Sequence, residues 1–593
     1  MPLPQLSGTL GKKRAAHLLR RATFGPTKTD IDTFSNYTVS QALNVLFQPV
    51  SEPAPPVNPA TGTTWIGTAP SDQEKDSDQI AYFRGWWIGQ MAAAGIAENK
   101  RLAHMTRERI VFFLHTHFTM RMEAVESSRA LYYYNALLRK YAFDAALPAK
   151  INIKELTKKI SIDNAMIMLL DGRLNVKGSP NENYARELLE LYTVGRGLPT
   201  NPPPKTKYFD PVTQLYYNDY GTFTELDVKQ AAKVLSGWDF DNTFSVTDTE
   251  TGLPIGKVKG TPYPNQHDTS TKTFSNRFKN KTISSVPVVI TNQDGTTSTV
   301  NTQQSLIDEI SALVEMIYTD SDPADEAARN ICRRLYRFYI YHEIDADIDR
   351  DVIEPLVTTF KANNYKIEPV IKDILGSQLF YDGNAGVTDD TFGGLIKSPL
   401  EVALGTLNFF EYKLPDPYTE SQNFYEKTSF LLGSLKVMGL DFLNPIDVAG
   451  YEAYHQFPLW NRSWIATNAL VNRYKFVYDV IKPAPGPNDP VQIDLLSFFR
   501  DKFSSTASDP DALIADFISY MLPMYSKDTE ITDKRINYFK SQFLAPLQVN
   551  ANPVGYWQES WGLYTDPVRA TDLNSWLSIL VNSILQTPEY QLF

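Results

Sequence analysis

One stretch of the sequence carries an unusual number of groups that could bind a ligand or do chemistry. Residues 179–197 read SPNENYARELLELYTVGRG, so polar and charged side chains crowd into a few helical turns. The amides of Asn181 and Asn183 and the guanidinium of Arg186 are suited to binding a polar or anionic ligand. The carboxylate of Glu187 could act as a general acid or base, or could ligate a metal ion.

The same stretch also has a purely structural interpretation. Ser179 is a favourable N-cap and Glu182 stands three residues later, which predicts a capping box at the start of a helix. Arg186 is four residues from both Glu182 and Glu190, so it can pair with either carboxylate. Caps and ion pairs therefore account for most of the charge, but they leave Glu187 unexplained.

Two histidines, His115 and His117, end the segment HMTRERIVFFLHTHF (104–118), whose apolar run predicts a buried helix. Both are candidate catalytic groups and candidate metal ligands, with Glu187 as a third ligand. A two-residue step turns a helix by about 200°, so the pair cannot hold one metal ion unless the helix ends between them. The alternative for each is a hydrogen-bonded histidine of the core.

A third histidine, His267, is followed by Asp268 in the loop sequence NQHDTSTKTF. An adjacent carboxylate can orient an imidazole as a general base, which makes the two residues catalytic candidates. The alternative is that the pair only stabilises a turn.

A basic patch flanks the apolar face of the first expected helix, at about 10–22. Its members are Lys12, Lys13, Arg14, Arg20 and Arg21. Such a patch is either a solvated helix surface or a site that binds an anion such as phosphate.

Composition narrows the classes of function. The chain has 593 residues, of which 42% are hydrophobic, enough to bury a large core. Its net charge of −11 argues against sequence-independent nucleic-acid binding, which needs a basic surface. The single cysteine, Cys332, excludes an intramolecular disulfide, and no cysteine cluster is present for zinc or iron–sulfur binding. No apolar run reaches the length of a transmembrane helix, and we find no signal peptide in the chain as given.

These residues must be positioned by a mainly α fold. Helical spacing of apolar residues predicts a large multi-helix globular protein with long loop insertions at 200–223 and 240–303. Within the second insertion, β-branched runs flank Asp294-Gly295, which predicts one small β-hairpin at about 283–302. We expect residues 1–593 to form a single unit, with an N-terminal lobe (1–303) and a C-terminal helical lobe (304–593) as its subdivision.

Several stretches, in order, resemble the bacterial domain of unknown function 1800 family over essentially the whole chain. They include AAHLLRRATFGPT, RERIVFFLHTHF, NENYARELLELYTVG, DVKQAAKVLSGW, HDTSTKTF, KSPLEV, NALVNRYKF and TPEYQLF. Leu114, Tyr192 and the stretch 444–464 depart from the family pattern. The residues that match it are His17, Arg21, His115, His117, Asn181, Glu182, Asn183, Arg186, Glu187, His267, Asp268, Lys397 and Glu401.

The resemblance implies a bacterial source but no activity, because the family is named for lacking one. Family members are often exported and often encoded beside a sulfatase- or phosphatase-like protein, which suggests a protein partner. Arg21 and Lys397 join the asparagines and Arg186 as candidate binding residues on this basis.

Two functions from different classes therefore remain. The first is a non-catalytic helical scaffold or binding component of an exported or surface-associated assembly. It is favoured by the absence of a nucleophile elbow, a Walker loop and a dinucleotide-binding glycine motif. The second is a hydrolase-like enzyme, possibly metal-assisted, in which His115, His117, Glu187 and His267 converge in one pocket. No cofactor and no compartment are strongly implied.

Overall fold

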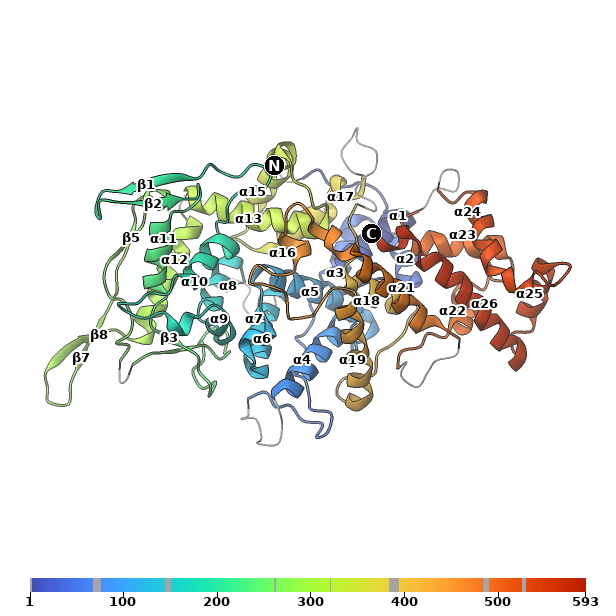
Figure 1. Ribbon diagram of the computed structural model, residues 1–593, viewed down its shortest axis with the longest axis horizontal. Helices are drawn as coiled ribbons and strands as arrows, with labels where there is room; N and C mark the ends of the chain where they lie inside the picture. Colours follow the sequence, from blue (N-terminus) through green and yellow to red (C-terminus); the bar gives the residue numbers. More distant parts are fainter. Residues whose placement is uncertain are drawn as a thin grey trace.

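The computed structural model describes residues 3–67, 76–143, 151–260, 263–319, 321–382, 394–483, 490–524 and 530–593. It is mainly α, as the apolar spacing predicts, and the molecule is elongated (Figure 1). The helices of the first half are α1 (Gly11–Ala22), α2 (Lys28–Phe34), α3 (Val39–Leu46), α4 (Asp76–Met91), α5 (Glu98–His117), α6 (Met122–Val125), α7 (Ser128–Phe143), α8 (Ile153–Ile160), α9 (Asn164–Leu169), α10 (Asn183–Glu187), α11 (Glu225–Val234) and α12 (Gln303–Thr319).

In the described residues of the second half of the chain, the regular elements are helices. Its helices are α13 (Ser321–Tyr339), α14 (Ala346–Ile348), α15 (Glu354–Ala362), α16 (Ile367–Gly376), α17 (Gln378–Asp382), α18 (Pro399–Phe409), α19 (Ser421–Val437), α20 (Glu452–His455), α21 (Thr467–Ile481), α22 (Leu495–Lys502), α23 (Pro510–Met521), α24 (Asp533–Phe543), α25 (Pro553–Gly562) and α26 (Pro567–Leu585). Within the residues that the structure describes, no helix combines the length and the apolar composition needed to cross a bilayer.

The strands of the described residues form antiparallel pairs and lie in the two insertions, except β3, which directly precedes the second one. The pairs are β1 (Thr206–Asp210) with β2 (Leu215–Asp219), β3 (Trp238–Asp239) with β4 (Lys257–Val258), β5 (Lys272–Thr273) with β6 (Thr282–Ile283), and β7 (Val288–Thr291) with β8 (Thr297–Val300). The β1–β2 and β7–β8 hairpins project at the end of the molecule opposite α25 (Figure 1).

The β7–β8 pair confirms the hairpin predicted at 283–302, with Val288 opposite Val300. The β1–β2 hairpin was not predicted, because Pro- and Asn-rich sequence around it indicated a loop. Cross-strand aromatic pairs explain why a hairpin forms there. Tyr208 lies opposite Tyr217, and the ring centroids of Phe209 and Tyr216 are 5.0 Å apart.

The helix in the 179–197 stretch begins later than the capping-box pattern predicts, so the Ser179 cap is wrong. Ser179 closes a tight turn instead, with its N–H donated to the Val176 carbonyl at 3.0 Å and Gly178 at a φ of 82°. The chain then enters α10 at Asn183, whose N–H is bound by the side-chain oxygen of Asn181 at 2.9 Å. Because Ser179 is held in this turn, its backbone does not adopt the conformation that an N-cap needs.

Other caps confirm the sequence pattern. Thr224 and Asp227 form a reciprocal capping box at the start of α11, with contacts of 3.3 and 2.8 Å. Ser398 is the N-cap of α18, and the Glu401 carboxylate accepts its N–H. Each box satisfies backbone donors that the first helical turn leaves without partners.

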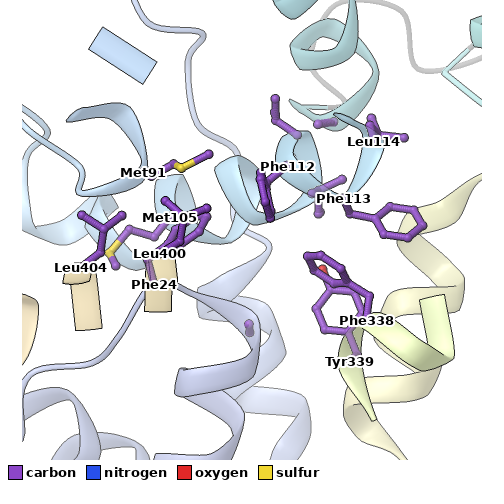
Figure 2. Close-up of a cluster of buried hydrophobic side chains, with 14 of the residues drawn as sticks. Phe24, Met91, Met105, Phe112, Phe113, Leu114, Phe338, Tyr339, Leu400 and Leu404 are labelled. Atoms are coloured by element: carbon purple, nitrogen blue, oxygen red, sulfur yellow. The ribbon is translucent and has the colours of Figure 1, made fainter. Parts of the chain in front are cut away.

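Helix α5 lies at the centre of the fold, and all of its residues from Leu102 to His117 are buried. It packs against α1, α3, α4, α7 and α13, which explains its run of five apolar residues at 110–114. Figure 2 shows its side chains meeting those of α13 and α18, with the rings of Phe113 and Phe338 5.3 Å apart. The core is one connected cluster that contains residues from both sides of position 303.

Candidate functional site

The two histidines of α5 point to different neighbours, as the 200° helical step predicts. His115 Nδ1 lies 3.1 Å from the Tyr134 hydroxyl, and its ring lies 5.3 Å from that of Trp87. His117 Nε2 lies 3.0 Å from the Tyr192 carbonyl oxygen. Burial lowers the pKa of His115 to about 3 and lowers that of His117 well below its ordinary value. Both are therefore neutral, hydrogen-bonded residues of the core near pH 7.

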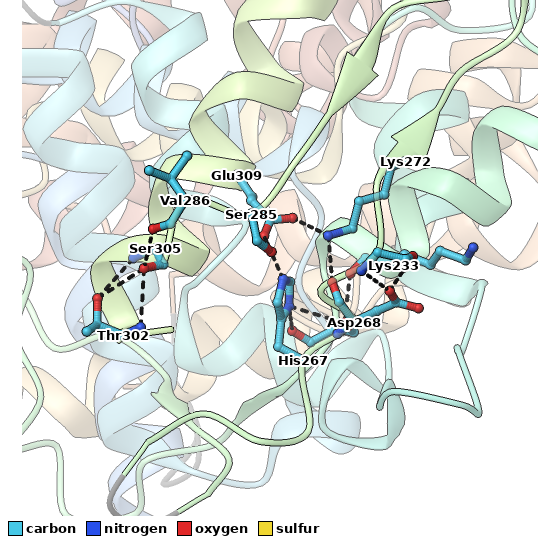
Figure 3. A network of polar contacts seen from close by, with 11 residues as sticks. Lys233, His267, Asp268, Lys272, Ser285, Val286, Thr302, Ser305 and Glu309 are labelled. Carbon is cyan, nitrogen blue, oxygen red and sulfur yellow. Dashed lines mark hydrogen bonds and ion pairs between the residues drawn. The ribbon is translucent and has the colours of Figure 1, made fainter. Parts of the chain in front are cut away.

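His267 belongs to a separate buried network (Figure 3). Its Nε2 lies 2.9 Å from Glu309 Oε1, and Glu309 also accepts from Lys272 and Ser285. Asp268 does not orient the imidazole, because its carboxylate accepts the N–H and hydroxyl of Ser270 instead. Glu309, on α12, makes the contact with the imidazole that was expected of Asp268. This contact links the second insertion to the helical body. No sequence signal singled Glu309 out, since it lies within an apolar helix.

The expected ladder forms only in part, because Arg186 pairs with Glu182 but not with Glu190. Arg186 makes a bidentate pair with Glu225 on α11, and its distance to Glu182 is 3.5 Å. Glu190 pairs with Arg196 at 2.5 Å. Arg186 therefore joins α10 to α11, a contact that the spacing within α10 could not predict.

Glu187 forms no hydrogen bond or ion pair with any residue that the structure describes. Burial and repulsion from Glu190 raise the pKa of Glu187 to about 7. Its charged neighbours are Glu190, Arg186, Arg196 and Asp447, so it does not meet the histidines, Arg21 or Lys397. Within the described ranges, no three His, Cys, Asp or Glu side chains are close enough to hold a metal ion.

Two other candidates, Arg21 and Lys397, are brought together around Glu401. Arg21 is fully buried and its guanidinium lies 4.3 Å from the centroid of the Phe593 ring. Lys397 Nζ donates to the Tyr590 carbonyl at 2.7 Å. Glu401 forms an ion pair with Arg109 of α5. We call the group made by Arg20, Arg21, Arg109, Lys397, Glu401 and Arg473 the cation cluster.

On one side of Glu401 lies a pocket that we call the arginine cleft, with a volume of about 40 Å³. Arg334 and Arg337, one helical turn apart on α13, contribute its charged wall. The cleft is lined mainly by aromatic and basic residues: Arg109, Phe113, Thr116, Arg334, Arg337, Phe338, His342, Leu395, Ile396, Ser398, Glu401, Ala453, Tyr454, Trp460, Asn461, Trp464 and Phe593.

Backbone carbonyls hold the two cleft arginines in place. Arg334 donates to the Leu191 carbonyl at 3.2 Å and to the Thr116 carbonyl at 3.5 Å. Arg337 donates to the His342 carbonyl at 3.3 Å and lies 4.4 Å from the centroid of the Trp460 ring. Neither arginine forms an ion pair with a carboxylate in the described part of the chain.

The electrostatics of the cleft follow from this lack of counter-charge. Burial lowers the pKa of Arg334 to about 10, and burial with repulsion from Arg334 lowers that of Arg337 to about 9. Both groups remain protonated near pH 7. Asn461 adds a buried Nδ2 that donates to no described residue. Besides the Arg109–Glu401 ion pair in its lining, the cleft therefore presents two cations and an amide donor to whatever enters it.

Sequence reasoning did not select Arg334 and Arg337. Within their segment, NICRRLYRFYIYH, only Cys332 entered the sequence analysis. The available signal was the presence of two arginines three residues apart on a helix whose other positions are mostly apolar. The stretch 444–464, the least typical of the family, contributes Tyr454, Trp460 and Asn461 to the cleft.

Fold and site thus define a large, mainly helical protein with a cationic, aromatic-lined cleft. Residues 17–592, essentially the whole chain, match the family described as "Protein of unknown function (DUF1800)". The protein belongs to this family, which confirms the resemblance. No curated protein and no solved structure matches the chain.

Proposed function

We propose that the protein is a non-catalytic binding component that holds an anionic group in the arginine cleft. The observation that carries this proposal is the pair Arg334 and Arg337, which face the cleft without a carboxylate partner among the described residues. A guanidinium removed from water is stabilised by a charge of opposite sign. An anion bound between the two side chains would supply it.

The size and lining of the cleft limit the ligand. A water molecule needs about 10–15 Å³ on the same measure, so about 40 Å³ admits a carboxylate, sulfate or phosphate group and little more. A planar guanidinium binds each of these groups through two parallel hydrogen bonds. The remainder of the ligand would lie outside the cleft. In an assembly, a protein partner would present this anionic group, and the sulfatase- or phosphatase-like protein suggested above is one such partner.

We do not propose the hydrolase-like alternative as a second function. It required His115, His117, His267 and Glu187 to meet in one pocket. The first three make separate contacts with Tyr134, the Tyr192 backbone and Glu309. No observation in the described residues favours that chemistry over binding.

Isothermal titration of the full chain with sulfate, phosphate and benzoate tests the proposal. We expect saturable binding of at least one of them, weakened at least tenfold by Arg337→Met and by Arg334→Met. Arg329→Met is the matched control, because Arg329 lies on the same helix but pairs with Glu354 and Glu326. Absence of binding by the wild-type chain, or equal binding by Arg337→Met, would refute the proposal.

A further inference from the structure

A second pocket lies on the other side of Glu401, and Lys397 is part of its lining. Its volume is about 30 Å³, and Phe24, Pro26, Tyr520 and Tyr590 are among its other lining residues. The Lys397 side chain is 6% exposed, although lysine is among the residues that are least often buried. The cleft proposed above and this pocket share Glu401 and Phe593 but have different basic residues.

Lys397 has no carboxylate partner within the described residues. Its Nζ donates to one neutral acceptor, the Tyr590 carbonyl at 2.7 Å, and lies 4.0 Å from the centroid of the Tyr590 ring. Glu401 is the only carboxylate side chain among the described residues that line this pocket. That carboxylate is held by Arg109 and by the N–H of Ser398.

Basic residues surround Lys397 on the elements that pack against it. Arg20 of α1 lines the same pocket and donates to the Tyr520 carbonyl. Arg473 of α21 donates to the carbonyl of Lys397 itself at 2.7 Å. Arg21 and Arg109 complete the positive side of the cation cluster, against the single carboxylate of Glu401.

Among the basic residues of this cluster, Lys397 loses its proton most easily. The arginine guanidiniums keep their protons near pH 7, whereas a buried lysine ammonium loses its proton more readily. Burial lowers the pKa of Lys397 well below its ordinary value, and repulsion from Arg20 and Arg473 acts in the same direction. Glu401 opposes this shift but does not cancel it. Burial beside Arg20 and Arg473, with only a neutral carbonyl as hydrogen-bond acceptor, therefore favours the neutral amine form of Lys397 at the wall of a small pocket.

We propose that Lys397 is a nucleophilic lysine that condenses with a small aldehyde or ketone to form a Schiff base. The Nζ lone pair attacks the carbonyl carbon, and a C–N bond forms as the C=O π bond opens to a carbinolamine. The former carbonyl oxygen leaves as water with the two amine protons, and an imine remains. No oxidant or reductant is needed. The pocket volume of about 30 Å³ restricts the reacting end to a group of a few heavy atoms.

The pH profile of reductive methylation distinguishes a neutral amine from an ordinary ammonium. The folded full chain is treated briefly with limiting formaldehyde and cyanoborohydride between pH 6 and pH 9. Methylation of each lysine is then quantified by mass spectrometry of the digest. Below a pKa of about 10.4, an ordinary lysine reacts roughly 100-fold faster at pH 9 than at pH 7. Exposed Lys413 serves as the internal reference.

We expect the methylation rate of Lys397 to rise less than about tenfold between pH 7 and pH 9. In the unfolded chain in urea, the same lysine should regain the steep profile, because burial and the arginines no longer act on it. The Arg20→Gln variant should steepen the profile in the folded chain. A profile parallel to that of Lys413, or no methylation of Lys397 at any pH, would overturn the proposal. Neither result depends on anion binding in the arginine cleft.

Discussion

Replacing Glu401 by Gln should be among the most destabilising single changes in this protein. The substitution preserves the size of the side chain and removes the only carboxylate of the cation cluster. Glu401 is 6% exposed, and its partner Arg109 is 2% exposed and lies 4.6 Å from the centroid of the Phe338 ring. In the variant, the Arg109 charge stays buried among aromatic rings without a counter-ion.

Removing one partner of a buried ion pair typically costs about 3–5 kcal/mol, and we expect a loss in that range for Glu401→Gln. Such a loss is a large part of the roughly 5–15 kcal/mol that stabilises a folded protein. Burial alone would raise the pKa of Glu401, but Arg109 and the Ser398 N–H hold it below its usual value. Its contribution is therefore present above the unfolded-state pKa of about 4.3 and is lost as the pH falls through the folded-state pKa.

Urea denaturation followed by circular dichroism measures this loss, with the difference between wild type and Glu401→Gln expected to be constant from pH 6 to pH 8. Glu98→Gln is the matched control, because Glu98 is 69% exposed and pairs with Arg101 at 2.7 Å. An exposed pair contributes about 0–1 kcal/mol. A double replacement, Glu401→Leu with Arg109→Met, should recover part of the loss because the Arg109 charge is removed together with its partner. A loss below 1 kcal/mol for Glu401→Gln would show that the cluster is hydrated or neutralised by another group, and our reasoning would be wrong.

Three further outcomes are expected from the same measurement. The pKa of His115 is about 3 in the folded chain and about 6.5 when unfolded, so acid destabilises the fold as the unfolded state binds the proton first. Between pH 6.5 and pH 4.5 this amounts to about 2.3 kcal/mol, and His115→Gln should lose about that much less than wild type over the interval. Arg186→Ala should cost only about 1 kcal/mol, because Arg186 is 28% exposed beside Glu225 and water screens the pair; a loss of 3 kcal/mol would contradict this. Thr224→Ala should cost about 1 kcal/mol through loss of a cap, whereas Ser179→Ala should change stability by less than about 0.5 kcal/mol, and equal effects would argue against the observed helix starts.

Features that depend on neighbouring residues could be predicted from the sequence alone. The mainly α class, the burial of α5 and the β7–β8 hairpin follow from apolar spacing and turn residues, which act over a few positions. The divergence of His115 and His117 follows from helix geometry alone. The Thr224 capping box depends on two residues three positions apart and is local in the same way. The Ser179 cap failed because a competing turn, equally local, binds the same backbone groups.

Only the tertiary structure decided which charged groups meet and which remain without a partner. Glu401 pairs with Arg109, 292 positions away, and Arg186 makes its bidentate contact with Glu225 on another helix, not with Glu190. The charge state of Lys397 and the exposure of Arg334 and Arg337 to a cleft depend on helices that are distant in sequence. Electrostatic interactions and desolvation act through space, and their strength is set by burial. The spacing of charges along the chain therefore indicates candidates, and the packing of the helices selects among them.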